Sequence, residues 1–161
     1  VVVDGDRIAL PEPLRSQVIA AAVELLNEVP QIAMAVSRDE LLAEPLPNSD
    51  HPDELSLRDR LRLSAVAERA PDIMRADQPG VTGSGRVGAT IANHGSPWDY
   101  DRRVPIIFWW PNAIGQERFY PIRTIDIAPT LANLIDVKPA GKIDGRCLDL
   151  PEFTTGKCRP E

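Results

Sequence analysis

The spacing of apolar residues predicts a helix near the start of the chain, between two extended segments. From residue 13 onward apolar side chains recur every three or four positions, and Pro30 ends the pattern, so a helix is expected over residues 13–29. Its apolar face comprises Leu14, Val18, Ala21, Ala22, Leu25 and Val29. Residues 1–10 are expected to be extended, with a turn at residues 4–6, and residues 32–36 are expected to form a short strand.

Two polar residues predict the starts of the next helices. Ser37 and Glu40 have the spacing of a capping box, so a short helix is expected to begin there. Ser56 opens a second helix, which carries apolar residues on one side and alternating charge on the other and is expected to end at Pro71. Residues 44–54 are dense in Pro, Asp and Asn, a composition that indicates a loop.

The remaining pattern predicts two more strands and a last helix. Residues 72–76 are expected to be a strand, and the continuous apolar run at residues 104–110 is typical of a buried one. Residues 124–126 precede a capped helix that tolerates Pro129 in its first turn. The apolar face of that helix comprises Ile127, Leu131, Leu134 and Ile135. Strands and helices in this order indicate a mixed α/β fold.

Composition narrows the classes of function. A chain of 161 residues with 43% hydrophobic residues can bury a real core within a single domain. The net charge of -6 and the lack of a basic patch argue against a nucleic-acid or anionic membrane surface. The longest apolar run, residues 104–111, is much shorter than the roughly 20 residues that a membrane span needs. No targeting peptide is visible at Val1, and upstream sequence is expected to be missing.

The two cysteines lie close together near the end of the chain. Cys147 and Cys158 could close a short loop as a disulfide, which would favour an oxidising compartment. Two free thiols in a flexible tail are the alternative.

Two candidate motifs have simpler interpretations. Residues 83–88 match G-x-G-x-x-G, but a dinucleotide site needs a strand before this motif and a helix after it, and neither is indicated here. A flexible loop is the favoured interpretation. His51 has several carboxylates around it and could join an acid–base or metal site. Pro52 and the lack of apolar neighbours favour a solvated loop instead.

His94 is the strongest candidate for a metal ligand. It precedes Gly95 in a turn just ahead of the apolar run at residues 104–110, and ligand sites of α/β proteins gather in loops at strand ends. A neutral imidazole is a good zinc ligand, and a neighbouring glycine permits close approach of the backbone. A histidine that packs and hydrogen-bonds in the turn is the alternative. The neighbouring residues supply no further ligands.

Two segments resemble the alkaline phosphatase superfamily. Residues 94–97 (HGSP), 100–101 (YD) and 104–108 (VPIIF) resemble its C-terminal metal-ligand segment, most closely that of the bacterial phosphate-irrepressible alkaline phosphatases, which are related to nucleotide pyrophosphatase/phosphodiesterases. Residues 124–131 (TIDIAPTL) resemble the helix that follows in the same superfamily, sulfatases included. The similarity runs through most of residues 1–150.

The resemblance implies a fold and its division. The fold would be part of a three-layer α/β/α alkaline-phosphatase-like fold with a small α+β subdomain. Residues 1–80 would form a strand–helix–strand and helical subdomain, residues 81–150 the C-terminal part of the metal-binding α/β core, and residues 151–161 a tail.

The resemblance also implies a mechanism. In such enzymes a threonine attacks phosphorus between two zinc ions, and metal-activated water hydrolyses the resulting phosphothreonine. Only His94 matches a family metal ligand, so this chain would supply one ligand and no catalytic residue. The nucleophile, the aspartate ligands and an Asp-His-Gly motif are expected upstream. Asp50 and His51 are not that motif, because Pro52 replaces the glycine and the spacing to His94 is too short.

The sequence therefore predicts the C-terminal part of a periplasmic or secreted, zinc-dependent phosphatase or phosphodiesterase that acts on a phosphate ester. The chain alone is expected to be inactive, because a single imidazole cannot fill a zinc site. Thr124 and Thr130 are expected to be structural, as a cap and in packing. Two alternatives stay open: a non-enzymatic α/β interaction domain in which His94 only packs, and a fragment of a sulfatase. The sequence does not distinguish monoester from diester substrates.

Overall fold

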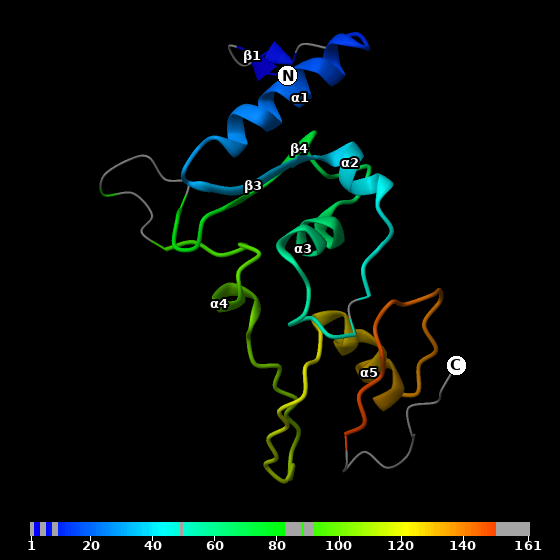
Figure 1. Ribbon diagram of the computed structural model, residues 1–161. Helices are drawn as coiled ribbons and strands as arrows, with labels where there is room; N and C mark the ends of the chain where they lie inside the picture. Colours follow the sequence, from blue (N-terminus) through cyan, green and yellow to red (C-terminus); the bar gives the residue numbers. More distant parts are fainter. Residues whose placement is uncertain are drawn as a thin grey trace. The chain divides into compact units, whose positions relative to one another are not determined.

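The computed structural model describes residues 2–3, 6–7, 10–48, 50–82, 88 and 92–150 (Figure 1). The elements are β1 (Val2–Val3), β2 (Asp6–Arg7), α1 (Leu14–Asn27), β3 (Ile32–Ser37), α2 (Arg38–Ala43), α3 (Leu57–Ser64), β4 (Ile73–Asp77), α4 (Asp99–Arg102), the 3-10 turn η1 (Thr124–Asp126) and α5 (Ile127–Leu134). They divide into two compact units. The first unit contains Val1–Ser49 and Leu55–Val104, and the second contains Asp50–Glu54 and Pro105–Glu161. The predicted division at residue 80 stays a prediction.

The first unit is built on a pair of antiparallel strands. β3 pairs with β4 in a register that runs from Ile32 opposite Asp77 to Ser37 opposite Ile73, with an irregularity between Ile32 and Met34. In Figure 1, α1 lies on one side of this pair and α3 on the other. β1 and β2 form a separate antiparallel pair. The predicted mixture of helices and strands is confirmed, with a two-stranded antiparallel sheet at its centre.

A small apolar core joins the strand pair to α2 and α3. Its buried members are Val36, Leu41, Leu61, Ala65 and Ala76. They come from both strands, from both helices and from the residue after α3, so burying them fixes these four elements together.

The predicted first helix is confirmed as α1, but its apolar face is only partly covered. Leu14, Val18, Leu25 and Val29 are all exposed. The helix is tied to the strand pair by a polar contact instead. The Asn27 side chain donates to the carbonyl oxygen of Ala35 at 2.9 Å and accepts from the Ala35 amide at 2.8 Å. These two bonds occupy backbone groups of β3 that would otherwise form an open sheet edge.

The serine caps start both following helices as predicted. The Ser37 hydroxyl accepts a bond from the Glu40 amide at 3.1 Å and starts α2. The Glu40 carboxylate pairs with Arg58 at 2.5 Å. Ser56 and Asp59 form a reciprocal capping box at the start of α3. The predicted end of this helix at Pro71 is wrong, because Ala65 turns to extended backbone and buries its side chain in the core.

The strand predicted over residues 72–76 is confirmed as β4, whereas the one predicted over residues 104–110 is wrong. That segment has no strand assignment, and Ile107 and Trp109 are 82% and 78% exposed. All of these residues except Val104 belong to the second unit, in which no strand is described. A strand needs a neighbouring strand to accept its backbone hydrogen bonds.

The second unit is organised around η1 and α5. The predicted helix is confirmed as Ile127–Leu134, but the predicted apolar face is wrong in part, since Leu131 and Ile135 are exposed. Polar residues are buried in their place, namely Asp126 and Thr130. Cys147 is disulfide-bonded, as expected, while Cys158 lies outside the described residues. None of the helices described is long and apolar enough to cross a membrane.

Candidate functional site

The candidate metal ligand lies in an irregular loop of the first unit. His94 is exposed and lies in residues 92–96, which precede α4 and have no helix or strand assignment. Its amide donates to the Asn93 side chain at 2.9 Å. Gly95 has a φ of +96°, a conformation that side chains beyond glycine rarely adopt. The glycine therefore lets the chain turn directly after the histidine, as the sequence predicted.

Asp101 of α4 holds the other side of this turn. The Ser96 amide donates to Asp101 Oδ2 at 2.5 Å. This bond to the charged carboxylate is the main reason why the pKa of Asp101 lies below its ordinary value of 3.8, and a hydrogen bond from the Ser96 side chain is the next contribution in the same direction. Asp101 thus fixes the backbone two residues after His94.

Two aromatic side chains join the same region to the last residue of β4 and to the segment that follows this strand. The indole nitrogen of Trp98 donates to the carbonyl oxygen of Asp77 at 2.8 Å. The Tyr100 hydroxyl accepts a bond from the Gly80 amide at 3.1 Å. The His94 turn and α4 are therefore attached to a strand that belongs to the core.

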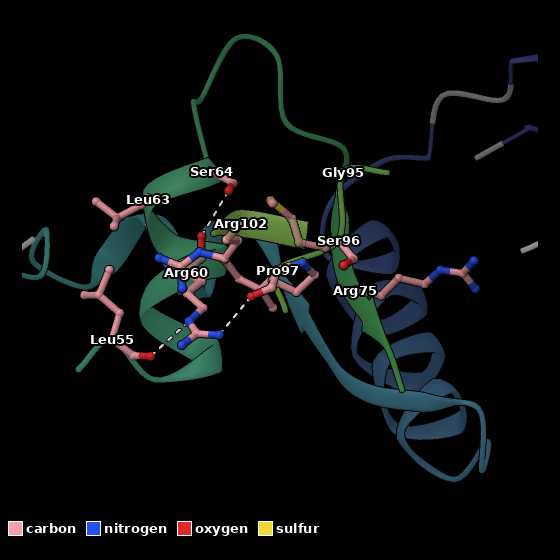
Figure 2. A pocket seen from close by; sticks show the side chains of 11 residues that line it. Leu55, Arg60, Leu63, Ser64, Arg75, Gly95, Ser96, Pro97 and Arg102 are labelled. Atoms are coloured by element: carbon pink, nitrogen blue, oxygen red, sulfur yellow. Dashed lines mark hydrogen bonds between the residues drawn. The ribbon is translucent and has the colours of Figure 1, made fainter. Parts of the chain in front are cut away.

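Arg60 of α3 contacts the loop that follows His94 and holds it in place. Sequence reasoning did not identify this residue. Its guanidinium donates to the carbonyl oxygens of Leu55 at 3.0 Å and Pro97 at 2.9 Å, as Figure 2 shows. It also pairs with Asp99 at 3.0 Å. The sequence showed only an alternating charge on one face of this helix, which is the usual pattern of a solvated surface.

His51 belongs to a different unit from His94, and most of the G-x-G-x-x-G motif lies outside the described residues. His51 is exposed in a loop of the second unit, where its carbonyl oxygen accepts a bond from the Glu54 amide at 3.0 Å. Of the G-x-G-x-x-G motif, residues 83–87 lie outside the described residues. Across the described part of the chain, no three His, Cys, Asp or Glu side chains gather closely enough to hold a metal ion.

The two threonines of the helix motif differ in their surroundings. Thr130 is buried, donates to the Asp126 carbonyl oxygen at 2.6 Å and accepts from the Leu148 amide at 2.9 Å, which confirms a packing role. Thr124 is exposed in η1, and the residue at the N-cap position is Arg123. The predicted capping role of Thr124 is therefore wrong.

Asp126 is the centre of this buried polar group. Its carboxylate accepts bonds from the amides of Arg123 and Arg146, each at 2.9 Å. The guanidinium groups of the same two arginines lie 3.6 and 3.7 Å from it. A fully buried carboxylate needs such compensation, and here it joins η1 to the segment around residue 146.

Comparison with known proteins relates the chain to phosphatases. It is 40% identical over 150 residues to alkaline phosphatase PhoD of Zymomonas mobilis subsp. mobilis, in an alignment that covers 92% of this chain and 26% of that protein. It is 39% identical over 147 residues to alkaline phosphatase PhoK of Sphingomonas sp., covering 89% of this chain and 26% of that protein. No protein-family model matches. The chain thus spans about a quarter of the length of these relatives.

Proposed function

We propose that this chain is part of a zinc-dependent phosphatase or phosphodiesterase of the alkaline phosphatase superfamily, of the phosphate-irrepressible type, and that His94 is one of its metal ligands. The observation that carries the proposal is the 40% identity to an alkaline phosphatase over 92% of the chain. Identity at this level over 150 residues includes the His94 turn and the helix at residues 124–131 within its span, and it favours a phosphatase over a sulfatase or a simple interaction domain.

The local geometry supports a ligand role for His94. The imidazole is exposed, while the backbone on either side is held by Asn93 and Asp101. A side chain on a fixed turn can approach a metal ion with little loss of conformational entropy. His94 alone does not form a site, because zinc in proteins takes three or four protein ligands. The other ligands would come from the part of the protein that this chain does not include.

The groups that carry out the reaction would likewise be divided between this chain and the remainder of the protein. A bound pair of zinc ions would activate a nucleophile and neutralise charge on the phosphoryl oxygens of a phosphate ester. The nucleophilic threonine, and with it the phosphothreonine intermediate, would belong to the remainder of the protein. Within this chain, Asp101 and Arg60 would act as positioning residues that keep the His94 turn in place.

The finer points of fold and location are proposals too. Residues 104–110 would become a strand of a three-layer α/β/α core once neighbouring strands are present, because their apolar run has the pattern of a strand buried on both faces. A periplasmic or secreted location is supported by the disulfide at Cys147, since disulfides persist in oxidising compartments.

The test compares the two histidines in a protein as long as the relatives. His94→Ala is expected to lower zinc affinity by at least about tenfold, since even residues that only orient a ligand can contribute that much. Phosphate-ester hydrolysis should fall with it. His51→Ala is the matched control, because it removes the same exposed side chain from a loop of the other unit, and zinc content should not change.

The 161-residue chain by itself provides the second half of the test. It should show no metal-dependent ester hydrolysis above background, because the nucleophile and the remaining ligands are absent. Unchanged zinc content in His94→Ala would contradict the ligand role and favour an interaction domain in which the histidine only packs. Hydrolysis of sulfate esters in preference to phosphate esters would contradict the phosphatase assignment.

A further inference from the structure

The two outer edges of the β3–β4 strand pair differ in how they are covered. On the edge of β3, the Asn27 side chain binds both the N–H and the C=O of Ala35. A sheet edge whose backbone groups are already bonded cannot accept a further strand at that position. An extension of this sheet is therefore expected on the β4 side.

The hydrogen-bond pattern identifies the outward backbone groups of β4. The Arg38 amide donates to the carbonyl oxygen of Asp72 at 2.9 Å, so the residue just before β4 faces β3. The register is regular from Ile73 to Ala76, and backbone direction alternates along an antiparallel strand. Ile73 and Arg75 therefore direct their N–H and C=O groups away from β3.

This outer edge of β4 is closed at its end and open in its middle. The carbonyl oxygen of Asp77, the last residue of β4, accepts a bond from the Trp98 indole at 2.8 Å. No hydrogen bond from elsewhere in the described part of the chain reaches the backbone of Ile73 or Arg75. Two N–H and two C=O groups are thus available to a further strand.

A cavity of about 350 Å³ lies beside this open edge. Met74 and Arg75 of β4 line it together with residues of α3 and the turn after His94, and none of its described lining residues belongs to β3 (Figure 2). The cavity is therefore on the β4 side of the strand pair, where an additional strand would run. Leu61 and Leu63 of α3 also line it, so a strand with apolar side chains at alternate positions fits this space.

We propose that the β4 edge pairs with an extended segment from the remainder of a protein as long as the relatives, which adds a third strand to this sheet. The inference rests on the proposed function, in which this chain is one part of such a protein. The aligned segment covers 26% of each relative, so most of a protein of that length lies outside this chain. Main-chain hydrogen bonds would hold the segment, and its alternate side chains would enter the cavity.

Amide hydrogen exchange, resolved residue by residue, tests this pairing without zinc and without activity. In the 161-residue chain the Arg75 amide is expected to exchange at close to the rate of an unprotected amide. In the longer protein it should exchange at least about 100-fold more slowly, because it would donate to the added strand. Met74 is the matched control, since its amide faces β3 and should be protected in both proteins.

Two substitutions at Arg75 separate its backbone from its side chain. Arg75→Pro removes the outward N–H and Arg75→Ala keeps it, while both remove the ion pair with Asp77. In the longer protein, Arg75→Pro is expected to reduce the protection of the Ile73 amide at least about tenfold, whereas Arg75→Ala should preserve it. Met74 should stay protected in both variants, because neither removes a bond to β3.

Fast exchange of Arg75 in the longer protein, with Met74 protected, would overturn the proposal. Protection of Arg75 in the 161-residue chain would also overturn it. If that protection grew with protein concentration the edge would pair with a second copy, and otherwise it would already be paired within the chain. Equal loss of Ile73 protection in Arg75→Ala and Arg75→Pro would contradict the role of the backbone. Slow exchange of Arg75 in the longer protein would support the added strand even if zinc content did not depend on His94, so a failure of the proposed metal site is distinguishable.

Discussion

At the scale of single residues, Gly145 shows how closely two backbone segments approach in the second unit. A Cβ at this position would overlap the carbonyl oxygen of Ile125 and lie 2.5 Å from its carbonyl carbon. Backbone atoms cannot rotate aside as a side chain can, so the two segments would have to separate. The approach is needed because the next residue, Arg146, donates its amide to the buried carboxylate of Asp126.

Gly145→Ala is therefore expected to lower the free energy of unfolding by about 2 kcal/mol, the usual cost of overpacking. Gly141→Ala is the matched control, because no atom lies within 4 Å of the Cβ it would add. Urea denaturation of both variants measures the difference. Equal stability of the two variants would contradict the close approach of the backbone at Gly145.

The turn after His94 is expected to lose stability at low pH, because Asp101 becomes protonated. The pKa of this carboxyl is below 3.8 in the folded chain, mainly because the Ser96 amide donates to it. A free carboxyl takes up its proton first as the pH falls, so the contribution of this bond to stability is complete above about pH 4 and is lost as the pH drops through the lowered pKa.

NMR titration of the Ser96 amide measures this transition directly. In the wild-type protein the signal should move with a midpoint below 3.8. In Asp101→Asn the same signal should no longer follow this titration, because the neutral amide has no proton to gain. A wild-type midpoint at or above 3.8 would contradict the bond between Ser96 and Asp101.

At the scale of elements, the helices that begin with local signals were predictable. Ser37 and Ser56 accept bonds from amides three residues ahead, and such contacts depend only on neighbouring sequence. The capping box predicted at Ser37 also involved the Glu40 side chain. That carboxylate pairs with Arg58, and a partner 18 residues away could not be predicted from neighbouring sequence. The end of α3 also depended on tertiary structure, because Ala65 leaves the helix to enter the core.

The burial of α5 shows a different limit of sequence reasoning. Periodicity assigned the buried side to apolar residues, yet Thr130 is buried and Ile135 is 70% exposed. Thr130 is buried because the Leu148 amide binds its hydroxyl, and this partner lies 18 residues further along the chain. Arg60 was missed for the same reason, since its partners Pro97 and Asp99 are brought to α3 only by the fold. Polar contacts between distant segments leave no periodic signal.

At the scale of the whole molecule, the apolar residues that remain exposed are the main unexplained feature. They include Val104, Ile107, Trp109, Ile114 and Phe119. These five lie in one stretch of the chain whose first part has the pattern of a buried strand, and large exposed apolar patches usually mark an interface. The relatives are about four times as long as the aligned segment, since it covers 26% of each. The proposed occupant of this surface is accordingly the remainder of a protein of that length, with strands on either side of residues 104–110.

Ile107→Ala tests whether residues 104–110 form a buried strand in the longer protein or remain an exposed loop. In the 161-residue chain the side chain is 82% exposed, so the free energy of unfolding should change by less than about 0.5 kcal/mol. In a protein as long as the relatives, the same change should cost about 2 to 5 kcal/mol, because it would leave a cavity between packed strands. Leu41→Ala is the matched control, since Leu41 is fully buried in the first unit and should destabilise both proteins. If Ile107→Ala were neutral in both, residues 104–110 would not be a buried strand of the longer protein, and the three-layer core proposed around them would be contradicted.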